Sequence, residues 1–173
     1  MYLKILGSVF LLASTASIGF LKAGELKIRT ERLNELKKVM LLLQGEFRFR
    51  RAPIPEAFEA VSKKAEAPFA GFLERVAAEL EAGKTGNFLR IWEKQCGELL
   101  SWEGMKREDQ QLLEQLGSSL GCFEVTLQLE MLQGVIRQTE EVLKTAKEQQ
   151  EVRGKLYQTM GVSLGALLTL LII

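Results

Sequence analysis

The sequence predicts an all-α protein, an antiparallel bundle of about six helices whose two long helices run into N- and C-terminal transmembrane anchors. Two long stretches repeat apolar residues at spacings of three and four, which is typical of helices packed along one another. No stretch alternates like a strand over more than four residues. The expected domains are an N-terminal anchor over 1–22, a cytoplasmic helical bundle over 23–155 and a C-terminal transmembrane helix over 156–173.

The stretch from Cys122 to Ile173 is predicted to be one long helix that begins polar and ends apolar. Its apolar series, interrupted only by Thr139, consists of Val125, Leu129, Leu132, Ile136, Leu143 and Ala146. From Leu156 onward no side chain is charged, and as a helix these residues span roughly 27 Å. Because a bilayer core is about 30 Å thick, this end of the helix is predicted to cross a membrane.

A second uncharged run, Ile5 to Leu21, predicts the other anchor. The alternative is a cleaved signal peptide, since Lys4 precedes the run and small residues lie within it. Basic residues gather on the inner side of both runs, which places the segment between them in the cytoplasm. They are Lys22, Lys27, Arg29, Arg32, Lys37 and Lys38 after the first run, and Lys144, Lys147, Arg153 and Lys155 before the second.

The other long amphipathic helix follows Gly24, a possible joint, and is expected to end near Arg51. Its heptad series, with Arg29 as the one break, is Leu26, Leu33, Leu36, Met40, Leu43 and Phe47. The sequence FRFRR over 47–51 has two interpretations. It is a binding patch for an acidic partner, or its cations stabilise the end of the helix while both phenylalanines pack inside.

Four shorter helices are expected between the two long ones. Pro53 and Pro55 predict an extended turn that opens a helix, with Glu56 in its first turn. A second helix starts at Pro68 and ends at Gly83, and a third covers 88–100 with Trp92 in the core, followed by Trp102 in a turn. The fourth opens at 107–109 and is closed by the turn from Gly117 to Gly121.

The composition argues against an enzyme. The chain has no histidine, and Cys96 and Cys122 form neither a metal-binding spacing nor a disulfide framework, so no cofactor or metal is expected. Adjacent carboxylates such as Glu108 and Asp109 are interpreted as solvated charge. The stretch Gly83-Lys84-Thr85 lacks the strand and the earlier glycine of a phosphate-binding loop. Neither a nucleic acid nor a small-molecule substrate is expected.

Charge is unevenly distributed along the chain, although its net value is only +1. Residues 1–51 carry ten basic and four acidic side chains, a net charge of +6, whereas residues 52–173 carry thirteen and eighteen, a net charge of −5. A basic segment next to a membrane suits an anionic leaflet, so membrane lipid is an expected partner.

Several sequence features together resemble the stage III sporulation protein AB family of endospore-forming bacteria. They are the N-terminal anchor, Ala52-Pro-Ile-Pro-Glu-Ala-Phe58, Ile91-Trp92, Leu116-Gly-Ser-Ser-Leu-Gly121 with Gln128, and the ending from Met160-Gly161 to Ile173. The family commonly has a small residue and an aspartate where this chain has Phe123 and Glu124. The family is in turn similar to the cytoplasmic helical domains of type II secretion and type IV pilus platform proteins.

The resemblance implies a non-enzymatic platform or scaffold subunit of the channel complex that links mother cell and forespore. It implies a place in the mother-cell membrane surrounding the forespore, with the bundle facing the cytoplasm. By analogy, the partner is the complex's secretion-type ATPase, the stage III sporulation protein AA. The alternative function is a membrane-tethered regulatory module that recruits one soluble partner.

Two sets of residues are candidates for contacts. The partner surface is expected around two turns, with Pro53, Pro55, Glu56, Gly117, Gly121 and Gln128, unless these turns merely join helices. Gly161 and Gly165, a GxxxG pair, are expected to pack in the membrane against a stripe of Gly7, Ser14 and Ser17 in the first anchor. The alternative is a homo-oligomer formed through the same glycines.

Overall fold

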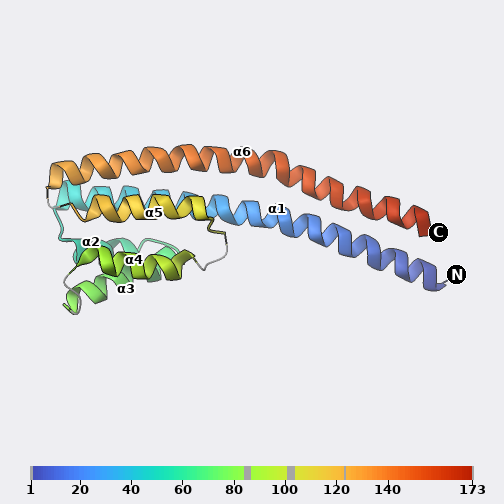
Figure 1. Ribbon diagram of the computed structural model, residues 1–173, viewed down its shortest axis with the longest axis horizontal. Coiled ribbons are helices and arrows are strands. Elements are labelled where there is room, and N and C mark those ends of the chain that lie inside the picture. Colours follow the sequence, from blue (N-terminus) through green and yellow to red (C-terminus); the bar gives the residue numbers. More distant parts are fainter. Residues whose placement is uncertain (1, 84–86, 101–103, 123, 173) are drawn as a thin grey trace. The chain divides into compact units, whose positions relative to one another are not determined.

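The computed structural model describes residues 2–83, 87–100, 104–122 and 124–172, and their side chains except at 2–6, 8–9, 11–12, 99–100, 158, 168 and 170–172. These residues form only helices (Figure 1): α1 (Tyr2–Gly45), the π-helical segment η1 (Glu46–Arg50), α2 (Ile54–Ser62), α3 (Phe69–Glu81), α4 (Phe88–Leu100), α5 (Arg107–Leu120) and α6 (Val125–Ile172). The prediction of an all-α bundle of six helices is confirmed. The expectations for Lys84, Thr85, Trp102 and Phe123 lie outside the described residues.

The chain divides into two compact units. One unit consists of residues 31–143, and the other combines residues 1–30 with residues 144–173. The long helices α1 and α6 each contribute to both units. Because α1 continues through Gly24 without interruption, the joint predicted there is wrong: one glycine costs a helix only about 1 kcal/mol relative to alanine.

The core of the 31–143 unit is built around Trp92 of α4. Helices α2, α3, α4 and α5 pack in consecutive pairs, and Trp92 is 2% exposed among rings from its neighbours. The ring centroid of Phe72 lies 4.9 Å away in an edge-on arrangement, and that of Phe58 lies 6.0 Å away. The Trp92 Nε1–H donates a hydrogen bond of 2.9 Å to the Leu113 carbonyl, which satisfies the one polar atom of this side chain.

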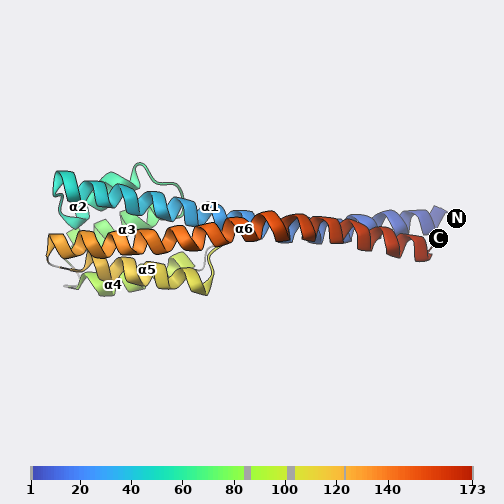
Figure 2. The same ribbon diagram turned by 90° about the horizontal axis from the view of Figure 1, so that it is seen from above.

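Helices α1 and α6 run antiparallel in the same unit (Figure 2). Their apolar series are buried as predicted at Leu33, Leu36, Met40, Leu43, Phe47, Leu132, Ile136 and Leu143. The one polar interruption, Thr139, is fully buried, and its hydroxyl donates to the Val135 carbonyl, 2.8 Å away. This back-bonding lets a hydroxyl sit in the helix interface without an unmade hydrogen bond.

Two expectations for α5 are wrong. The turn expected from Gly117 to Gly121 is shorter, because α5 continues through Gly117 and ends at Leu120, with Gly121 as its C-cap. The prediction that Asp109 is solvated charge is also wrong, since this side chain is fully buried. Its carboxylate accepts the backbone N–H of Lys106 at 2.8 Å, at the first turn of α5. A carboxylate at this place also interacts favourably with the helix dipole.

Replacing Asp109 with alanine is expected to lower the free energy of unfolding by about 1–2 kcal/mol, because the Lys106 N–H loses its acceptor. The exposed Gln111 on the same helix is the matched control, and Gln111→Ala should change stability by less than about 0.5 kcal/mol. Urea denaturation followed by circular dichroism measures both. Equal stability of the two variants would contradict the capping role.

The other unit pairs the first part of α1 with the last part of α6, again antiparallel. Gly154 lies opposite Ala23, and Gly161 lies opposite Thr15 and Gly19. The helices touch through small residues, and a Cβ atom added to Gly161 would lie 2.8 Å from the Thr15 carbonyl oxygen. Large apolar side chains of this unit are exposed instead: Phe10, Ile18, Phe20, Leu21, Leu156, Met160, Val162, Leu164 and Leu167.

Over the residues that the structure describes, no helix has a stretch both long and apolar enough to cross a bilayer. The two predicted transmembrane anchors are therefore not confirmed. Both predicted segments, 1–22 and 156–173, include residues whose side chains the structure does not describe.

Candidate interaction surface

The turn between η1 and α2 presents the first group of sequence-predicted contact residues. Pro53 is the exposed N-cap of α2, Pro55 is half-buried in its first turn, and Glu56 is exposed. The next two residues, Ala57 and Phe58, are fully buried and fix this turn to the core. Because proline restricts the backbone, the turn is held in one conformation while its carboxylate faces solvent.

Gly117 and Gly121 lie in different surroundings from this turn. Gly117 is buried in α5, where a Cβ atom would lie 2.5 Å from Trp92 Nε1. At Gly121 a Cβ atom would approach Leu89 Cδ2 at 3.3 Å. Gly117 thus allows Trp92 to pack closely on α5, and it is not available to a partner.

Gln128, near the start of α6, lies close both to the end of α5 and to the turn before α2. Its side chain is buried, and its Nε2 donates a hydrogen bond of 3.1 Å to the Leu120 carbonyl at the end of α5. It also lines a cavity of about 380 Å³ together with Phe47, Arg51, Ala52, Val125 and Thr126. The structure therefore brings Gln128 close to Ala52, the residue before Pro53, whereas Gly117 lies elsewhere in the core.

The residues Arg48, Phe49, Arg50 and Arg51, here called the basic tip, form the end of η1 and the residue after it. Phe47 is buried, but Phe49 is 80% exposed, so the expectation that both phenylalanines pack inside is wrong. The Arg48 guanidinium lies 5.7 Å from the centre of the Phe49 ring, and Arg50 pairs with Glu46 at 2.9 Å. Arg51 has a φ of 50°, which is unusual for a residue with a side chain. Sequence reasoning recognised the charges of this segment but not its exposed ring.

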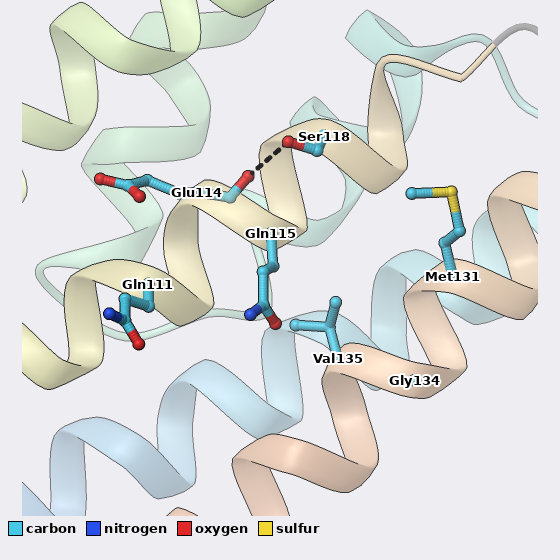
Figure 3. A pocket seen from close by; sticks show the side chains of 7 residues that line it. All are labelled: Gln111, Glu114, Gln115, Ser118, Met131, Gly134 and Val135. Carbon is cyan, nitrogen blue, oxygen red and sulfur yellow. Dashed lines mark hydrogen bonds between the residues drawn. The ribbon is translucent and has the colours of Figure 1, made fainter.

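A groove between α5 and α6, here called the α5–α6 groove, was not predicted. It has a volume of about 730 Å³ and is lined by Gln111, Glu114, Gln115, Ser118, Met131, Gly134 and Val135. Figure 3 shows polar side chains along α5 and the apolar Met131 and Val135 on α6, with the Ser118 hydroxyl donating to the Glu114 carbonyl. A Cβ atom added to Gly134 would meet nothing within 4 Å, so the groove is open there. The glycine at position 134 was the one sequence feature that could have indicated this groove.

Cys96 lies in the core close to this groove. Burial raises the pKa of its thiol to about 12, and the nearby Glu114 and Glu93 carboxylates act in the same direction. The other thiol, Cys122, is half-buried after the end of α5. A buried thiol of raised pKa is a packing group rather than a nucleophile.

At pH 8, iodoacetamide is expected to alkylate Cys122 of the folded protein and to leave Cys96 unmodified, because the Cys96 thiol is buried and burial raises its pKa. In the folded state Cys96 keeps its proton above pH 9.0, its ordinary pKa, up to about 12. The folded protein therefore binds more protons than the unfolded one in this window, and its stability should fall as the pH rises through it. Mass spectrometry of the alkylated protein and urea denaturation from pH 8 to 11 measure the two effects. Rapid modification of Cys96 in folded protein would contradict its burial.

Within the described ranges, no three His, Cys, Asp or Glu residues are grouped so that they could hold a metal ion. The surface features of this part of the chain are instead a proline turn, a basic tip and a groove between helices. The chain is thus an all-helical protein whose surface features suit contacts with other macromolecules.

Comparisons with known proteins agree with this class. The family model "Stage III sporulation protein AB" matches residues 4–173. The stage III sporulation protein AB of Bacillus subtilis (strain 168) is 25% identical over 173 residues, which cover 98% of this chain and 99% of the relative. A solved structure of a stage III sporulation protein AB is similar in fold, with a TM-score of 0.66 at 18% identity, over 72% of this chain and 98% of that one. The chain belongs to the stage III sporulation protein AB family, a family of sporulation proteins.

Proposed function

We propose that this protein is a non-enzymatic platform subunit of the channel complex that links mother cell and forespore during endospore formation. The family match over residues 4–173 is the observation that carries the proposal. In this role the 31–143 unit docks the secretion-type ATPase of the complex, the stage III sporulation protein AA. The partner is inferred from the likeness of this family to the cytoplasmic domains of secretion platform proteins.

The proposed location is the mother-cell membrane around the forespore, with the bundle facing the cytoplasm and residues 1–22 and 156–173 as its anchors. Two observations support membrane attachment. Both segments contain uncharged apolar runs, and the unit that they form exposes large apolar side chains while its helices touch through glycines. This arrangement suits lipid, where close packing of small residues holds helices together, better than water. Gly161 and Gly165 are proposed to pack in the membrane for the same reason.

The proposed ATPase contact is the exposed proline turn, with Pro53, Pro55 and Glu56, together with the adjoining cavity beside Gln128. Glu56→Lys should reduce the amount of ATPase that co-purifies by about tenfold or more, since it reverses an exposed charge at the contact. Glu59→Lys is the matched control, because Glu59 is also exposed on α2. Equal co-purification with the two variants would exclude this turn as the contact.

Purification of the tagged full chain from sporulating cells in mild detergent tests the platform role. A stable complex of several membrane subunits and the ATPase is expected. Recovery of the chain with one soluble partner alone would instead favour the second function, a membrane-tethered regulatory module.

The topology is tested with a cysteine replacing the exposed Lys63 and a serine replacing Cys122, since the buried Cys96 can remain. A membrane-impermeant maleimide should label this thiol only after the cells are lysed. Labelling of intact cells would overturn the cytoplasmic placement of the bundle.

A further inference from the structure

We propose that the basic tip of one copy of this chain docks into the α5–α6 groove of a second copy. This contact shares Arg51 with the cavity of the proposed ATPase contact but does not depend on the ATPase. Both surfaces belong to the 31–143 unit, and both are formed by described residues.

The basic tip has the features of an anchor that inserts into a partner. Phe49 is 80% exposed, the largest exposed fraction among the described large apolar residues, and Arg48 lies beside its ring. The π-helical turn and the left-handed Arg51 hold the segment in an uncommon backbone conformation. Such conformations persist only where the surrounding structure fixes them, and they are often found at functional positions. Aromatic and arginine side chains are enriched at the centres of protein interfaces.

The groove offers the complementary chemistry. Its α5 side carries hydrogen-bond acceptors in the side chains of Gln111, Glu114, Gln115 and Ser118, and a guanidinium is a donor only. Its α6 side provides the Met131 thioether, which suits an aromatic ring. The absence of a side chain at Gly134 leaves room for that ring.

Charge identifies a second copy as the occupant. Residues 1–51, which end in the tip, have a net charge of +6, whereas residues 52–173, which contain the groove, have a net charge of −5. The groove itself contributes one carboxylate, that of the exposed Glu114. One chain therefore carries both halves of a charge-complementary contact.

The tip cannot reach the groove of its own chain. Arg51 lines a cavity with Val125 at the start of α6, and Gly134 lies nine residues further along, about 13 Å at the rise of a helix. The contact therefore joins two different surfaces of two copies. A pair joined by one such contact leaves one tip and one groove available, so further copies can add head to tail into a ring or a row.

A photoreactive benzoylphenylalanine in place of Phe49 tests the contact directly, because it preserves an aromatic side chain at the tip. The purified full chain in detergent is irradiated, and the product is analysed by mass spectrometry. A cross-linked dimer whose adduct lies within 131–135 of the second chain is expected. No dimer, a dimer cross-linked elsewhere, or an adduct with added phosphatidylglycerol alone would overturn the proposal.

Charge exchange provides an independent test by light scattering. The tip variant carries Arg48→Glu and Arg51→Asp, since aspartate tolerates the left-handed conformation. The groove variant carries Glu114→Lys and Gln115→Lys, because both side chains line the groove. Each alone should self-associate at least about tenfold more weakly, and an equimolar mixture should recover association. The control is a variant with Arg90→Glu and Lys63→Glu. It changes the net charge by the same amount as the tip variant, at two exposed residues elsewhere. Unchanged association of the tip variant, or no recovery in the mixture of folded variants, would refute the contact.

Discussion

Leucine in place of Gly117 is expected to lower the free energy of unfolding by about 3 kcal/mol. The Cβ atom of any larger residue would overlap the Trp92 ring, at 2.9 Å from Cγ and 2.5 Å from Nε1. Trp92 is 2% exposed and packed against Phe72, so its ring has no space into which it can move. Its displacement would also break the hydrogen bond to the Leu113 carbonyl.

The same substitution at Gly97 of α4 is the control. A Cβ atom there would meet nothing within 4 Å, and leucine is a better helix former than glycine. Gly97→Leu should therefore raise stability by up to about 1 kcal/mol. Chemical denaturation and near-ultraviolet circular dichroism of the tryptophans measure both variants. Equal stabilities of Gly117→Leu and the unmodified protein would contradict the close packing of α4 on α5.

Cysteines replacing Ala23 and Gly154 are expected to form a disulfide within one chain almost completely. A Cβ atom at position 154 lies 4.0 Å from that of Ala23, within the distance range of disulfides. A serine replaces Cys122, and the buried Cys96 remains. Non-reducing electrophoresis should show a monomer of altered mobility. A dimer would instead support the alternative that the C-terminal segments of two copies associate.

Gly19→Ile in this background should reduce the yield of the intrachain disulfide several-fold. A Cβ atom at position 19 would lie 2.5 Å from the Tyr157 carbonyl oxygen, and a backbone atom cannot move aside as a flexible side chain can. Gly7→Ile is the matched control, because a Cβ atom there meets nothing within 4 Å, and it should leave the yield unchanged. If both variants still form the disulfide, the two helices do not depend on glycine contacts.

The fold class could be predicted because it depends on periodicity. The apolar series of α1 and α6 repeat often enough to identify both helices, and proline marked the start of α2. The role of Gly117 could not be predicted, because a glycine in the sequence indicates a turn as readily as a close contact within a helix. Only the position of Trp92, far away in the sequence, shows that it is a close contact. The expected contact residues are located by the structure, but their role in binding stays a prediction.

Two of the wrong expectations, for Phe49 and Asp109, could have been avoided from the sequence alone. Residues two apart on a helix point to different faces, so this spacing argued against packing both Phe47 and Phe49 inside, and the structure buries only the first. Asp109 is the third residue of a helix that opens at Arg107, a position where acidic side chains cap the preceding backbone. The exposed ring and the buried carboxylate thus follow from local geometry, whereas the α5–α6 groove depends on how two helices meet.

The Thr139 hydroxyl oxygen lies 3.6 Å from the Met40 sulfur, a contact between residues 99 positions apart. A ribosome adds about 5–20 residues per second, so Met40 is synthesised roughly 5–20 seconds before Thr139. Helices α2 to α5 can pair in sequence during that interval, since each packs on the next. The part of the apolar stripe of α1 that α6 covers has no partner until α6 is translated, and such transiently exposed apolar surface favours aggregation.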